Sequence, residues 1–172
     1  ETYSIESIDL TPEGISECAR LLRLVSPNAG RFTEKYLQWQ YNLNPAGQAV
    51  GFNARIGGQL AAHYAALPII SLIRGRQVKG LLSLNTATHP EHRRRNLFTQ
   101  LARAACQRGK EQGYEFVIGV ANANSTPGFI KKLGFTLISP LQAKLGLGKI
   151  NLPDSGENAV YRRVWSGQML GW

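Results

Sequence analysis

Three consecutive arginines at positions 93–95 carry the clearest chemical signal in this chain. They follow an extended segment that ends at His89 and directly precede a helical pattern that begins at Leu97. The first amide N–H groups of a helix have no intrahelical acceptor, and nearby guanidinium groups add bidentate donors, so this combination suits a phosphate. A charge run alone is more often a solvated basic turn. Its place between a strand end and a helix start predicts a phosphate site at residues 93–99.

Two residues, His63 and Tyr64, are the candidates for acid–base chemistry. They lie on an extended segment before Pro68, where they could face a bound acceptor, and an unperturbed imidazole titrates near about 6.5. A hydrogen-bonded core histidine is the competing interpretation. No metal site is expected, because Cys18 and Cys106 have no CxxC or Cys/His spacing around them.

Length, composition and charge narrow the class of protein. The 172 residues fit one domain spanning 1–172, and 43% hydrophobic with 18% charged residues excludes a disordered chain or a coiled coil. A net charge of +9 predicts an anionic partner of some kind. The chain has neither an apolar run long enough for a membrane helix nor a secretion signal, so we expect a cytoplasmic protein with no membrane partner. It starts at Glu1, which leaves a longer parent chain open.

Hydrophobic periodicity and turn residues predict elements that alternate along the chain. Helices are expected at residues 11–25, 33–43, 97–112 and 126–133, and Thr11 and Thr33 are the expected caps of the first two. Strands are expected at 49–56, 59–73, 77–89, 114–121, 134–138 and 158–165, with a hairpin turn at Gly57-Gly58. Pro68 should interrupt the second strand, since proline cannot donate to a sheet ladder. Residues 140–156 receive no assignment. The order predicts a mixed sheet with helices on its faces.

Residues 81–135 resemble the GNAT superfamily of acyl-CoA-dependent N-acyltransferases. In that family a strand ends in a short proline-containing turn, and the pattern (Q/R)-x-x-G-x-(G/A) then opens a helix. Arg93 fits the first position of the pattern, whereas Asn96 and Phe98 replace the small residues. Asparagine tolerates positive φ, and Phe98 is expected to point into the core. The family's later motifs match Asn122-Ala123-Asn124-Ser125 and Lys132-Leu133-Gly134-Phe135.

The resemblance implies an α/β fold: a central, mixed and mostly antiparallel sheet with two splayed parallel strands, 81–89 and 114–121, flanked by helices. It implies that acetyl-CoA (coenzyme A) binds between those two strands. The cofactor-binding residues would be Thr86, Ala87 and Thr88 at the pantetheine arm, Arg93, Arg94, Arg95, Asn96, Leu97, Phe98 and Thr99 at the pyrophosphate, and Asn124, Phe129 and Lys132 along the arm and its far end.

The activity implied by the resemblance is direct acetyl transfer, in a ternary complex, to a small-molecule or peptide amine. Many family members place a glutamate on the strand before the turn and a tyrosine at the position of Ile130, and both are absent here. A non-catalytic acyl-CoA sensor of the same fold is therefore an alternative. A basic nucleic-acid-binding module is a further one, although zinc-knuckle spacing and the aromatic pattern of RNA-binding sheets are missing. A homodimer stays open.

Overall fold

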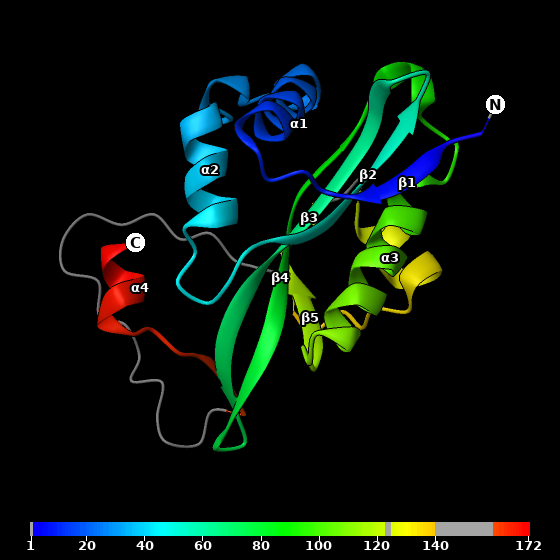
Figure 1. The fold of residues 1–172 in the computed structure, drawn as a ribbon. Helices are drawn as coiled ribbons and strands as arrows, with labels where there is room; N and C mark the ends of the chain where they lie inside the picture. Colours follow the sequence, from blue (N-terminus) through cyan, green and yellow to red (C-terminus); the bar gives the residue numbers. More distant parts are fainter. Residues whose placement is uncertain (1, 123–124, 140–159) are drawn as a thin grey trace, which may run out of the picture.

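A mixed β-sheet with helices on both faces forms the framework of the protein (Figure 1). The structure is a computed structural model, and it describes residues 2–122, 125–139 and 160–172. Its strands are β1 (Ser4–Ser7), β2 (Val50–Ile56), β3 (Gln59–Ile73), β4 (Arg76–Thr88), β5 (Phe116–Gly119) and β6 (Tyr161–Arg163). Its α-helices are α1 (Pro12–Val25), α2 (Glu34–Asn42), α3 (Leu97–Glu111) and α4 (Gly167–Gly171). Short helical turns lie at Ala29–Arg31 and Pro90–His92, and a π-helix spans Gly128–Lys132.

The sheet order is β1-β2-β3-β4-β5, with β6 paired to the far end of β3. Neighbours from β1 to β4 run antiparallel, whereas β4 and β5 run parallel because α3 connects them as a crossover. The Gly57-Gly58 hairpin has positive φ at both residues, as the sequence predicts. The mixed sheet, its two parallel strands and the flanking helices confirm the expected fold class.

Local sequence signals determine where the first two helices begin. The Thr11 hydroxyl accepts from the amide of Gly14, and the Thr33 hydroxyl accepts from the amide of Tyr36, so both helices start at the predicted caps. Helix α1 then buries Ile15, Cys18 and Leu22 at helical spacing. Among the described residues, no helix has the length and apolarity needed to cross a bilayer.

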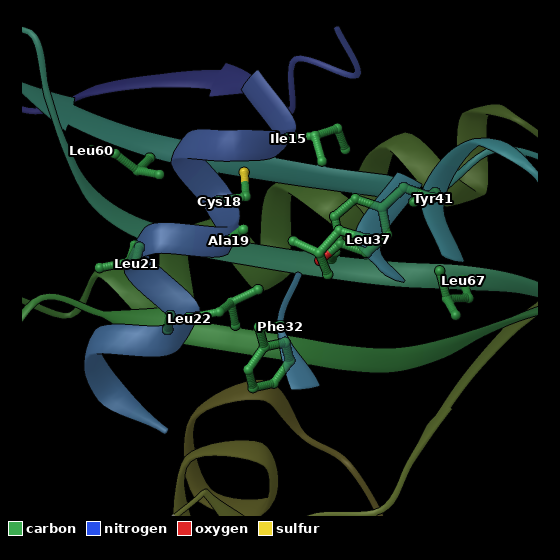
Figure 2. Close-up of a cluster of buried hydrophobic side chains, with 13 residues drawn as sticks. Ile15, Cys18, Ala19, Leu21, Leu22, Phe32, Leu37, Tyr41, Leu60 and Leu67 are labelled. Carbon is green, nitrogen blue, oxygen red and sulfur yellow. The ribbon is translucent and has the colours of Figure 1, made fainter. Parts of the chain in front are cut away.

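Two hydrophobic clusters occupy the two faces of the sheet. Helices α1 and α2 cover one face, where Figure 2 shows Ile15, Leu37 and Tyr41 directed toward the strands. Helix α3 covers the opposite face through Leu97 and Leu101. Successive residues of a strand point to opposite faces, so neighbouring residues on β3 enter different clusters.

Several elements differ from the sequence prediction, and one of them is helix α4 (Gly167–Gly171), where no element was expected. Strand β1 was not expected, because its four residues are all exposed and carry no alternating apolar pattern. Residues 134–138 form no strand, since no neighbouring strand pairs with them in the described part of the chain. The last predicted strand is confirmed only over Tyr161–Arg163, and its residues 158–159 lie outside the described ranges.

Pro68 does not interrupt β3, which also differs from the prediction. The pairing of β3 with β2 ends at Ala66, and its pairing with β6 begins at Ser71, so no described strand pairs with that edge of β3 at Pro68. The Pro68 carbonyl on that edge accepts a hydrogen bond from Nδ2 of Asn44 at 2.9 Å. A proline with no N–H loses nothing at an open edge, and the strand therefore continues through it.

Candidate cofactor site

The edge of β4 that faces β5 is free over its last residues. Parallel pairing with β5 ends at Ser83↔Gly119, but β4 continues to Thr88. In the part of the chain that the structure describes, no strand pairs with residues 84–88 on that side. An unpaired strand edge offers backbone N–H and C=O groups to an extended ligand.

Beyond β4, the turn into α3 contains two residues with left-handed backbone conformation. After the helical turn Pro90–His92, Arg94 has φ 63° and Asn96 has φ 61°. Asparagine is among the residues that adopt this region most readily, so Asn96 keeps a backbone shape that the family pattern assigns to glycine. The substitution of that glycine is compatible with the turn.

The first turn of α3 is open toward this turn. Asn96 is the N-cap, yet its side chain makes no capping hydrogen bond. The first intrahelical bond runs from the amide of Gln100 to the carbonyl of Asn96, so the amides before it have no such partner. The side chains of Leu97 and Thr99 are buried, which leaves their main-chain N–H groups as the groups they could offer to an anion.

Phe98 points away from this helix start and packs on the α3 face of the sheet. Its ring makes an edge-to-face contact with Phe129 at 5.0 Å and a tilted contact with Tyr64 at 6.3 Å, both between ring centroids. A Cβ at Gly128 would meet the Phe98 ring at 2.9 Å, so the glycine makes this close approach possible. The expected inward orientation of Phe98 is confirmed, and Phe129 packs with it and with Phe135.

Four basic side chains surround the turn. Arg93, Arg94 and Arg95 are exposed, and Lys132 reaches the turn from the Gly128–Lys132 segment, with its Nζ 3.4 Å from Oδ1 of Asn96. Lys132, which lies far away in sequence, therefore adds to the positive potential of the arginine run. Asn124, the remaining residue expected at the site, lies outside the described residues.

The expectation that His63 and Tyr64 face an acceptor is wrong, because both side chains are in the core and on opposite faces of the sheet. His63 is 0% exposed: its Nε2 lies 2.9 Å from Oη of Tyr41, and its Nδ1 lies 2.8 Å from Oδ1 of Asn53. Burial lowers the pKa of His63 to about 3. Tyr64 is 1% exposed and donates to Oγ of Ser83 at 2.9 Å, while burial raises its pKa to about 12. Neither group can exchange protons with a bound amine in this position.

Two polar residues at the beginning of the free edge of β4, Asn85 and its partner Gln40, were not expected from the sequence. Asn85 lies on β4 itself and bonds to Gln40 and Tyr41 of α2. Gln40 and Tyr41 are buried among apolar neighbours, and such residues on a helix read as ordinary core positions. An asparagine inside a strand, a residue type that strands disfavour, was the one available signal of an irregularity there.

Within the described part of the chain, one group of side chains could ligate a metal ion: His89, Glu91 and His92, whose ligand atoms lie within 4.8 Å of one another. The Glu91 side chain is 78% exposed, and three arginines follow the group directly in sequence. Nearby positive charge disfavours a divalent cation. That the protein binds no metal stays a prediction.

The sequence matches the family model of the acetyltransferase (GNAT) domain over residues 7–138. The chain belongs to the GNAT acetyltransferase family. The matched range runs from the end of β1 to the irregular residues after the Gly128–Lys132 segment, and it contains the free edge of β4, the basic turn and α3. No curated protein matches the chain at the level of sequence.

Solved structures of other GNAT proteins share the fold. A GCN5-related N-acetyltransferase from Ralstonia eutropha JMP134 superposes with a TM-score of 0.66 at 15% identity, covering 84% of this chain and 99% of its own. A predicted acetyltransferase with acetyl-CoA from Clostridium acetobutylicum gives 0.65 at 18% identity, covering 85% and 97%. Glucosamine-6-phosphate N-acetyltransferase from Arabidopsis thaliana gives 0.60 at 16% identity, covering 84% and 99%. Identities this low establish the shared GNAT fold and leave the acceptor open.

Proposed function

We propose that this chain binds acetyl-CoA along the free edge of β4 and the start of α3, and transfers the acetyl group directly to an amine in a ternary complex. One observation carries the proposal. The unpaired edge at residues 84–88 leads, through a turn with two left-handed residues, into a helix start that has no side-chain cap and is surrounded by arginines. This arrangement offers a strand edge for an amide-containing arm and, beyond it, N–H and guanidinium donors for a diphosphate.

The residues of this site fall into two groups by the part of the cofactor that they would hold. Backbone groups of Thr86, Ala87 and Thr88 would pair with the pantetheine arm. The turn and helix start would hold the pyrophosphate through Arg93, Arg94, Arg95, Asn96, Leu97, Phe98 and Thr99, with Lys132 beside Asn96. In Leu97, Phe98 and Thr99 the contribution is the main-chain amide, because their side chains pack inward.

Bound acetyl-CoA would supply a thioester whose carbonyl carbon accepts the amine nitrogen. The C–N bond forms, the C–S bond breaks, and the amine proton must leave. Strand β4 carries no carboxylate and His63 is buried, so we propose that water accepts this proton. The thiolate leaves with little assistance, since a free thiol has a pKa of about 8.5.

The proposal is tested first by the binding of acetyl-CoA and then by the transfer of its acetyl group. Acetyl-CoA should raise the melting temperature, because a ligand at about 100 times its Kd stabilises the folded state by about 2.7 kcal/mol. Release of free thiol should then be measured with amino sugars, aminoglycosides, peptide amino termini and lysine peptides. The absence of any thermal shift at about millimolar acetyl-CoA would overturn the proposal.

A sensor of acyl-CoA is the second candidate, and one observation favours it. Ile130 stands where many relatives carry a tyrosine, and with 39% of its surface exposed it offers no proton to a departing thiolate. Binding of acetyl-CoA without thiol release for any amine would favour the sensor. A thermal shift with duplex DNA or RNA at moderate salt, in place of one with acetyl-CoA, would instead favour the nucleic-acid alternative.

A further inference from the structure

Asn85 forms a β-bulge at the beginning of the free edge of β4. In the register with β3, Tyr64 pairs with Thr86 and Ala65 pairs with Leu84, so Asn85 is the extra residue. Its backbone is left-handed, with φ 42°. A non-glycine residue adopts this left-handed conformation at some cost in free energy. The conformation persists where contacts with surrounding residues hold it in place.

The side chain of Asn85 has such contacts, and both come from α2. Its Nδ2 donates to Oε1 of Gln40 at 2.9 Å and to Oη of Tyr41 at 3.0 Å. An amide nitrogen carries two hydrogens, so these bonds use its full donor capacity. Gln40 is itself fixed, because its Nε2 donates to Oη of Tyr36 at 3.0 Å.

Tyr41 is held in turn by His63, which gives this buried histidine a role. Burial lowers the pKa of His63 to about 3, so the ring is neutral and carries one N–H. Nδ1 lies 2.8 Å from the amide oxygen of Asn53, a pure acceptor, which assigns the N–H to Nδ1 and leaves Nε2 as an acceptor. The hydroxyl of Tyr41 therefore donates to Nε2 of His63 and accepts from Nδ2 of Asn85. The donor and the acceptor of each of these bonds are thus assigned.

We infer that Asn85 is a positioning residue for the cofactor: through Gln40, Tyr41 and His63, helix α2 fixes the bulge that aims the free edge of β4 toward bound acetyl-CoA. The bulge lies two residues after the last pair with β5, Ser83↔Gly119, and just before Thr86, Ala87 and Thr88. The backbone angles of Asn85 thus set the direction of the amides and carbonyls that follow it. This inference rests on the proposed function.

Substitutions at Asn85 separate the hydrogen bonds from the backbone preference. Asn85→Gly permits positive φ and removes both bonds to α2, whereas Asn85→Ala also opposes positive φ. The matched control is Arg74→Gly, which relaxes another left-handed residue, with φ 49°, in the turn between β3 and β4. Tyr41→Phe keeps the ring and removes one of the two acceptors of Asn85.

We expect Asn85→Gly to fold and to raise the acetyl-CoA Kd, and the KM for acetyl-CoA, by about tenfold, with the KM for the amine changed less than about twofold. Tyr41→Phe should raise both acetyl-CoA constants by about threefold, and Arg74→Gly should leave them unchanged. If Asn85 were needed only because it tolerates positive φ, Asn85→Gly would leave both acetyl-CoA constants unchanged. An Asn85→Gly protein that binds acetyl-CoA as well as the wild type would overturn the inference.

Hydrogen exchange without ligand keeps this test independent of the proposed function. The amides of residues 84–88 should exchange faster in Asn85→Gly than in the wild type and should be unaffected by Arg74→Gly. Equal exchange in all three proteins would overturn the tie between α2 and the bulge. A wild type that shows no acetyl-CoA binding would overturn the proposed function, and the exchange result would still decide whether the tie fixes the bulge.

Discussion

Two polar regions of this protein differ in how far their hydrogen-bonding groups are satisfied within the protein. Around Asn96 the arginines are exposed, and the helix start has no side-chain cap. Around His63 the side chains are buried, and both ring nitrogens of the histidine have partners. The first region has donors to offer to a ligand, whereas the second has none left.

The contrast corrects a common inference from residue type. A histidine is the most frequent acid–base catalyst, and an arginine run is often only a solvated surface. In this protein the burial and the hydrogen bonds of each group indicate the reverse roles. His63 supports the structure, and the arginine turn is the candidate binding site. Exposure and an uncapped helix start identify the candidate site better than residue type does.

Replacing His63 by leucine should have the largest effect on stability. The variant removes the acceptor of the Tyr41 hydroxyl hydrogen and the donor to the amide oxygen of Asn53, so each of these buried groups loses one hydrogen bond, at about 1–3 kcal/mol each. We expect urea denaturation to show a loss of about 3 kcal/mol in the free energy of unfolding. His63→Gln, which can keep one of the bonds, should lose less. A loss below about 0.5 kcal/mol for leucine would show that the network does not stabilise the fold.

Replacing Asn96 by valine should have the next largest effect, and mainly on binding. A β-branched residue opposes φ 61° at a cost of about 1–2 kcal/mol, and relaxation of the turn would move the first amides of α3. Calorimetry should show about tenfold weaker acetyl-CoA binding, whereas Asn96→Gly should stay within about threefold of the wild type. Arg74→Val provides the control, since it strains a left-handed residue in the turn between β3 and β4. An equal loss in that control would remove the turn before α3 from the binding site.

The buried histidine also makes stability depend on pH. Its pKa is about 3 in the folded protein against about 6.5 for a free imidazole, so the unfolded chain binds the extra proton between these values. Stability should therefore fall as the pH drops below about 6.5, by at most about 1.4 kcal/mol per pH unit. Urea denaturation at about pH 7 and about pH 5 should show a steeper loss in the wild type than in His63→Gln. Parallel losses in the two proteins would contradict a neutral buried His63.

Reversing one charge in the basic turn should have the smallest effect. Arg94→Glu should weaken acetyl-CoA binding several-fold, and the loss should shrink at high salt, because exposed charges are screened. Arg20→Glu is the matched control, because Arg20 is a similarly exposed arginine on α1, the helix that covers the other face of the sheet. If both variants weaken binding equally, only the net charge of +9 attracts the cofactor.

Much of the fold could be read from local signals. Thr11 and Thr33 cap their helices as predicted, and Gly57-Gly58 forms the predicted hairpin. The local signals did not predict strands whose formation depends on a pairing partner elsewhere in the chain. Ser4–Ser7 became a strand because the edge of β2 was available, and Pro68 stayed in β3 because its edge is open.

The candidate site divides in the same way. The basic turn at Arg93, the tolerant Asn96 and the inward Phe98 could be predicted, because a turn and a helix start depend on a few consecutive residues. Lys132 was expected near the far end of the arm, but it lies beside Asn96, from which 36 residues separate it in sequence. Only the folded chain brings such groups together.

The sequence by itself determined the order of the elements from α1 to β5, the family and the position of the arginine turn. These properties depend on short stretches of consecutive residues, because the spacing and the type of the side chains act through local geometry. The tertiary structure alone decided that His63 is buried, that Asn85 forms a bulge, and that Gln40 and Tyr41 of α2 hold it. Burial and hydrogen-bond partners come from segments that meet only on folding. Burial and partners together determine whether a polar side chain supports the structure or is available to bind a ligand.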